Sequence, residues 1–123
     1  MKARAINPRK PNELTKAEKA FSEWPWFVEN FAFRRYEAFT LKLGETRYTP
    51  DFSGIDVTDQ QVCFFEVKAS PHPAVYTPVA KLRLQNAAEM FPEYRFYVAW
   101  PIKPKGSWHI EEVSNKTRNA GDF

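Results

Sequence analysis

Residues 62–68, with the sequence VCFFEVK, form the most strand-like segment of the chain. The segment is apolar at odd and even positions until Glu66, as expected of a strand covered on both faces. Side chains two residues apart leave the same face of a strand, so Glu66 and Lys68 project together while Val67 points into the core. A carboxylate and an ammonium on such a strand are costly unless they pair, bind a ligand or reach water. The segment therefore predicts a central strand with a polar site at its end.

The chain before this strand is predicted to hold one helix and two strands. Thr15 followed by Glu18 is a capping-box pattern, and the helix that it starts should end or bend at Pro25. Alternating apolar residues predict a strand over 34–43, and a second strand is expected from residue 47 to about residue 57. The turns between these strands are predicted at 44–45 and 58–61.

The chain after the central strand predicts a helix and one or two further strands. Thr77-Pro78 combines a capping hydroxyl with Pro at the first helical position, and Pro92 should stop the helix. Strands are expected over 94–100 and 108–113. A strand–helix–strand unit implies a crossover and a parallel pair. The predicted class is α/β, a mixed central sheet flanked by helices in the order α-β-β-β-α-β.

The 123 residues suffice for one domain, assigned to 13–113, with a basic arm at 1–12 and a polar tail at 114–123. The chain has no apolar run near the roughly 20 residues of a membrane helix, so no membrane partner is expected. A single cysteine, Cys63, fits a reducing cytoplasm. His72 and His109 are too few, with that cysteine, for the usual zinc site.

The charged residues of the arm are all basic: Lys2, Arg4, Arg9 and Lys10. Such an arm suits contact with nucleic-acid phosphates, although a solubilising tail explains it equally well. Arg34 and Arg35, at the start of a predicted strand, are a second candidate phosphate contact. A solvated strand end is the alternative.

Asp51 lies on the strand before Glu66 and directly follows a proline, which suggests a bend or an edge there. If the two strands form a hairpin closed near 58–61, Asp51 falls opposite Glu66 to Lys68. Three charged side chains then converge at one position of the sheet.

This cluster has the chemistry that phosphodiester hydrolysis needs. Asp51 and Glu66 can hold Mg²⁺, with the backbone carbonyl of Val67 as a further ligand. The metal would acidify a bound water, and Lys68 would orient that water or pair with phosphoryl oxygens. The alternative is an interstrand salt bridge without a function, because the Glu-x-Lys triplet by itself is common.

The segments YTPDF (48–52) and FFEVKA (64–69) resemble motifs II and III of the PD-(D/E)XK nuclease superfamily. The likeness is closest in style to small phage proteins of the endonuclease I and Holliday-junction resolvase kind, and it covers roughly 13–100. The N-terminal part of heteromeric Tn7-type transposases has a similar pattern. The resemblance implies a restriction-endonuclease-like core, Asp51 and Glu66 as metal ligands, and Lys68 as the catalytic lysine.

Relatives in this superfamily often add a glutamate from the first helix and a Lys or Gln from the helix after motif III. Glu18 occupies the first position, where its capping role explains it as well, and Glu13 is the second choice. Lys81 and Gln85 occupy the position on the helix after motif III. The alternative is that both are ordinary residues of the helix surface.

The expected function is a Mg²⁺-dependent DNA endonuclease of phage or mobile-element type, in which Mn²⁺ can substitute and which acts on branched DNA such as a Holliday junction. Junction cutting needs two symmetric incisions, so a homodimer is expected. The alternatives are a non-catalytic DNA-binding or assembly module of the same fold, and a nuclease subunit that a partner protein targets, as in the transposase likeness.

Overall fold

The computed structural model describes residues 13–113, and the predicted basic arm and C-terminal tail lie outside them. The described elements follow one another as α1 (Lys16–Ser22), α2 (Pro25–Asn30), β1 (Phe31–Tyr36), β2 (Leu41–Leu43), β3 (Thr46–Tyr48), β4 (Phe52–Asp56), β5 (Val62–Val67), α3 (Pro78–Met90), β6 (Arg95–Ile102) and β7 (Ser107–Glu112). No helix in this part of the chain is long and apolar enough to cross a membrane.

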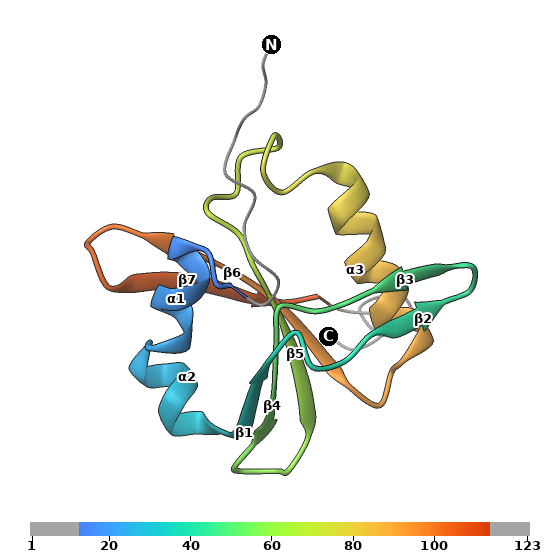
Figure 1. The fold of residues 1–123 in the computed structure, drawn as a ribbon, viewed down its shortest axis with the longest axis horizontal. Helices are drawn as coiled ribbons and strands as arrows, with labels where there is room; N and C mark the ends of the chain where they lie inside the picture. Colours follow the sequence, from blue (N-terminus) through green and yellow to red (C-terminus); the bar gives the residue numbers. More distant parts are fainter. Residues whose placement is uncertain (1–12, 114–123) are drawn as a thin grey trace, which may run out of the picture.

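A five-stranded sheet in the order β1-β4-β5-β6-β7 forms the centre of the fold, and β2 and β3 pair separately as a hairpin. The β5–β6 pair is parallel and the other pairs are antiparallel. Helices α1 and α2 lie on one side of the sheet, and α3 lies on the other (Figure 1). The predicted α/β class, the mixed sheet and the parallel crossover through a helix are confirmed.

Strand β5 is the centre of the core, as its apolar sequence predicts. Phe65 is fully buried in an aromatic cluster under α1 and α2, where its ring lies 5.6 Å from that of Phe21 and 5.1 Å from that of Phe27. Phe64 points to the other face and packs with Leu84 of α3. The two faces of one strand therefore serve two hydrophobic clusters.

Both predicted helix starts are confirmed by their caps. The hydroxyl of Thr15 accepts from the N–H of Glu18 at 3.1 Å, while the Glu18 carboxylate accepts from the N–H of Thr15 at 2.8 Å. The hydroxyl of Thr77 accepts from the N–H of Ala80 at 3.1 Å. Each cap satisfies N–H groups that have no partner within the helix itself.

Two predicted strands are each divided in the structure, and this corrects the prediction. The segment 34–43 holds the end of β1 and all of β2, separated at Glu37, which has φ +49 and cannot continue an extended strand. The segment 47–57 holds β3 and β4, separated at Thr49-Pro50-Asp51 because Pro50 has no N–H for a ladder. The bend expected beside Asp51 is thus present.

The first helix ends before Pro25, as predicted, but the chain then forms α2, a six-residue helix that was not predicted from the sequence. Pro25 stands at its first position, where a missing N–H costs nothing. Strand β1 follows immediately at Phe31 and so begins earlier than expected.

Candidate active site

The β4–β5 hairpin brings Asp51 to Glu66. Phe52 pairs with Phe65, so Asp51 stands opposite Glu66, within the range expected from the turn at 58–61. The carboxylate of Asp51 continues the ladder beyond β4, because its Oδ2 accepts from the backbone N–H of Val67 at 2.8 Å. Asp51 is thereby fixed at the end of the hairpin.

Glu66 is held by two donors, one on each carboxylate oxygen. The Tyr48 hydroxyl donates to Oε1 at 2.7 Å, and the Lys68 ammonium lies 3.2 Å from Oε2. The side chains of Glu66 and Lys68 are only 15% and 20% exposed. The backbone N–H of Lys68 donates to the carbonyl of Ala99, so β6 fixes the end of β5 that carries this pair.

Glu18 reaches the same place from α1. Its side chain is buried, and besides the capping bond its Oε1 accepts from the Tyr36 hydroxyl at 2.9 Å. It is also close enough to Asp51 for a side-chain hydrogen bond. The capping box therefore positions Glu18 for the site, and the two roles considered for this residue are compatible.

The electrostatics of the cluster are dominated by the crowding of acids around Asp51. Burial, and then the negative charge of Glu66, raise the pKa of Asp51 from 3.8 to about 8; Glu18 adds to the rise and the Val67 N–H opposes it. Burial and the charge of Glu66 also hold the pKa of Tyr48 well above 10, so this hydroxyl remains a donor. Asp51 therefore keeps its proton to a higher pH than an ordinary carboxyl does.

The donor set suits a hard divalent cation, although it is not arranged as a closed cage. Within residues 13–113, no group of three or more His, Cys, Asp or Glu side chains is already spaced to hold a metal ion. Each oxygen of Glu66 has a partner, the Tyr48 hydroxyl on one and the Lys68 ammonium on the other. Mg²⁺ prefers carboxylate oxygens, keeps several waters and is commonly bound by one or two carboxylates, so Asp51 and Glu66 fit that mode.

Comparison of the chain with protein-family models, with curated proteins and with solved structures finds no match in any of the three.

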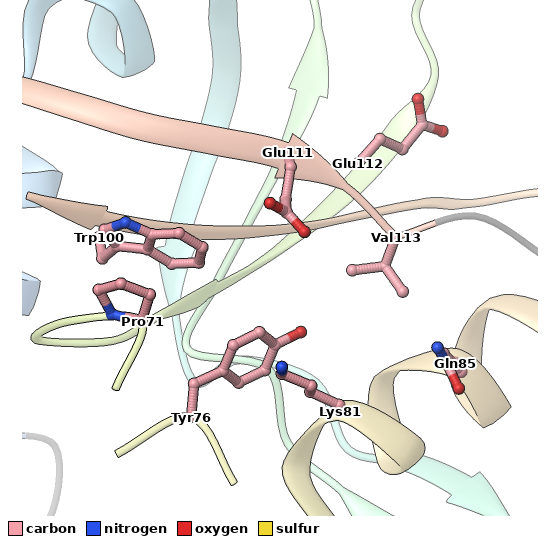
Figure 2. Close-up of a pocket in the computed structure, with 8 residues that line it drawn as sticks. All are labelled: Pro71, Tyr76, Lys81, Gln85, Trp100, Glu111, Glu112 and Val113. Atoms are coloured by element: carbon pink, nitrogen blue, oxygen red, sulfur yellow. The ribbon is translucent and has the colours of Figure 1, made fainter. Parts of the chain in front are cut away.

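The two candidate accessory residues on α3, Lys81 and Gln85, line a neighbouring cavity of about 340 Å³ between α3 and strands β6 and β7 (Figure 2). The Lys81 ammonium lies 5.1 Å from the centre of the Tyr76 ring. Burial, followed by the charges of Glu111 and Glu66, raises the pKa of Tyr76 to about 12. This cavity therefore adjoins the site electrostatically, through Tyr76.

The two candidate phosphate contacts of β1, Arg34 and Arg35, have different surroundings in the structure. The guanidinium of Arg34 donates to the carbonyls of Val28 and Phe31 and so anchors the end of α2. Arg35 is exposed and donates to the carbonyl of Arg34 at 3.1 Å. The basic residues of the arm lie outside the described residues.

Two site residues, Tyr36 and Tyr48, receive no role in the sequence analysis. Each donates its hydroxyl to one of the site glutamates, Tyr36 to Glu18 and Tyr48 to Glu66. Tyr48 lies within the YTPDF motif, which is its local signal in the sequence. Nothing local marks Tyr36, because its partner is 18 residues away.

Proposed function

We propose that this protein is a Mg²⁺-dependent DNA endonuclease, with Mn²⁺ able to substitute. The observation that carries the proposal is the meeting of Asp51 and Glu66 across the β4–β5 hairpin, with Lys68 beside Glu66 and Glu18 beside Asp51. Like charges that raise a carboxyl pKa within a partly buried site are typical of functional sites. A divalent cation would relieve the repulsion that the fold has built in.

In this proposal Asp51 and Glu66 would hold the metal, with Glu18 and the Val67 carbonyl as further candidates. The bound metal would supply an acidified water and stabilise negative charge on the phosphate. Lys68 would offer its ammonium to the phosphoryl oxygens or to the attacking water. Tyr48 and Tyr36 would keep Glu66 and Glu18 in position through their hydroxyl groups.

The likeness of YTPDF and FFEVKA to PD-(D/E)XK motifs supports the same function, and a restriction-endonuclease-like core is part of the proposal. We also propose that the protein is a cytoplasmic homodimer. Its substrate would be branched DNA such as a Holliday junction, in phage or mobile-element DNA metabolism. A partner protein that directs the nuclease is the variant suggested by the transposase likeness.

The test is a cleavage panel with supercoiled, linear and four-way-junction DNA, with Mg²⁺, with Mn²⁺ and with EDTA. We expect metal-dependent nicking that Lys68→Ala reduces at least 100-fold, as is common when a charged transition-state contact is removed. Lys42→Ala, on the exposed face of β2, is the matched control. Equal cleavage by wild type and Lys68→Ala would disprove the mechanism.

A non-catalytic DNA-binding module of the same fold is the second candidate. It is favoured by one observation, namely that the described side chains form no ready-made metal group. Calorimetric titration of Mg²⁺ into wild type and Asp51→Asn separates the two candidates. Heat in the wild type alone supports the nuclease, whereas no binding by either at millimolar metal supports the module.

A further inference from the structure

A hollow of about 190 Å³ opens on the sheet beside the candidate active site and is distinct from the cavity of Figure 2. Its walls include two exposed aromatic rings, Phe33 and Phe39, together with Arg35, Ser53 and Ile55. Phe33 and Arg35 belong to β1, an edge strand of the sheet, and Phe39 belongs to the segment that follows it. Ser53 and Ile55 belong to β4.

The wall formed by Phe33 is held in a strained conformation. Phe33 has φ +55, which a bulky side chain rarely adopts, and β1 loses its regular register between Ala32 and Arg35. In this conformation Phe33 is 69% exposed. A bulge that turns a large apolar ring into water gains nothing for the core, and such strain is typical of functional positions.

The floor of the hollow contains a polar group without a partner. Ser53 is only 5% exposed, and among the described residues its hydroxyl has no hydrogen-bond partner. Buried polar groups are nearly always paired, so an unpaired one calls for a ligand or a water. A rotation about the Cα–Cβ bond is sufficient to redirect a serine hydroxyl.

The hollow and the carboxylates share one face of the sheet. Ser53 pairs with Phe64, and Phe64 is two residues from Glu66 on β5. The side chains of Ser53 and Glu66 therefore leave the same face of the sheet. Two residues along a strand span roughly 6–7 Å. At about 3.4 Å per stacked nucleotide, a DNA strand at Glu66 reaches the hollow within about two nucleotides.

We propose that this hollow binds one unpaired nucleobase of the DNA strand that the active site cuts, a step that rests on the proposed function. The base lies against Phe33 and Phe39, its polar edge meets the Ser53 hydroxyl, and the exposed guanidinium of Arg35 meets a flanking phosphate. Aromatic side chains stack with any base, because every base has a π face. A base inside a duplex has no free face, so the preferred substrate has unpaired nucleotides close to the cut.

The test measures binding in EDTA, where metal-dependent cleavage is absent. The probes are a gapped duplex with an unpaired 2-aminopurine, the same DNA with an abasic residue at that position, and a fully paired duplex. We expect quenching of the 2-aminopurine emission and tighter binding of the unpaired base, by about 5- to 150-fold for one stacked base.

Phe33→Gly removes the ring, and it also relieves the strain because glycine adopts positive φ readily, so this variant should fold. It should lose most of the preference for the 2-aminopurine probe over the abasic probe, with Phe39 and Ser53 supplying what remains. Ser53→Ala should weaken binding of the base while leaving the abasic probe unaffected. Met90→Ala, at an apolar position on α3 that is 50% exposed, is the control and should behave as wild type.

Undiminished preference for the unpaired base in Phe33→Gly would overturn the proposal. So would a Phe33→Gly variant that changes only self-association or protein binding, because the hollow would then be a protein interface. If quenching depends on Phe33 but no DNA is cleaved with Mg²⁺, the nuclease function fails and the base site stands. If DNA is cleaved with Mg²⁺ but neither quenching nor binding depends on Phe33, the nuclease function stands and the base site fails.

Discussion

Replacing Asp51 by Asn is expected to stabilise the metal-free protein at high pH while removing its metal site. The Asp51 carboxyl is partly buried beside Glu66 and Glu18, and its pKa is about 8 instead of 3.8. Asn carries no charge, and its side-chain oxygen can still accept from the N–H of Val67. The substitution therefore removes the repulsion and keeps the hydrogen bond that fixes the hairpin end.

The size of the effect follows from the pKa of Asp51. The difference between 3.8 and about 8, at about 1.36 kcal/mol per pH unit, sets an upper limit of about 6 kcal/mol. Water and mobile ions reach this partly exposed group, so we expect about 1–3 kcal/mol in the free energy of unfolding. For a chain of this length that corresponds to a rise in Tm of roughly 3–15 °C.

The pH dependence has a definite sign. A carboxyl whose pKa is higher in the folded protein than in the unfolded chain stabilises the fold at low pH and loses that contribution as the pH rises. The stability of the wild type should therefore fall between about pH 4 and pH 8, whereas Asp51→Asn lacks this slope. The two proteins should be nearly equal at pH 4 and differ most at pH 9.

The assay is urea unfolding followed by tryptophan fluorescence at pH 4, 7 and 9 in EDTA, repeated with Mg²⁺. Metal at 100 times its Kd should add about 2.7 kcal/mol to the wild type and nothing to Asp51→Asn. Glu45→Gln, an acid-to-amide change at an exposed turn, is the control and should leave the pH dependence unchanged. A lower stability of Asp51→Asn than of wild type at pH 9 in EDTA would refute the reasoning.

Three further outcomes are expected. Tyr48→Phe should lower Mg²⁺ affinity or cleavage about 10- to 100-fold, because Glu66 loses the donor that orients it. Calorimetry and the cleavage panel would measure this, and an unchanged affinity would assign Tyr48 to packing alone. Thr15→Ala should cost about 1 kcal/mol of stability through loss of the cap, measured by thermal unfolding, and should leave metal binding nearly intact. Glu18→Gln should keep the capping bond and lose metal affinity, whereas wild-type affinity in calorimetry would restrict Glu18 to its structural role.

Local signals in the sequence were sufficient for the elements whose causes lie within a few residues. The Thr15–Glu18 and Thr77–Pro78 patterns predicted both caps, because a helix start is decided by side chains and N–H groups two or three positions apart. The apolar run of β5 predicted a strand buried on both faces, and the strand–helix–strand order predicted the parallel pair. Chain order and the turn at 58–61 also predicted that Asp51 falls opposite Glu66 to Lys68, and the strand register sets it opposite Glu66.

The tertiary structure decided the features that depend on residues far apart in the chain. The bend beside Asp51 was expected from Pro50, but alternation did not reveal that Glu37 divides the other strand, nor that the strained Phe33 is largely exposed. The hydroxyls of Tyr36 and Tyr48 find their glutamates 18 residues away, and Glu18 meets Asp51 only when α1 packs against the sheet. The residue types of the site were thus legible in the sequence, whereas their orientation and charge state arise from burial and long-range contacts, which exist only in the folded chain.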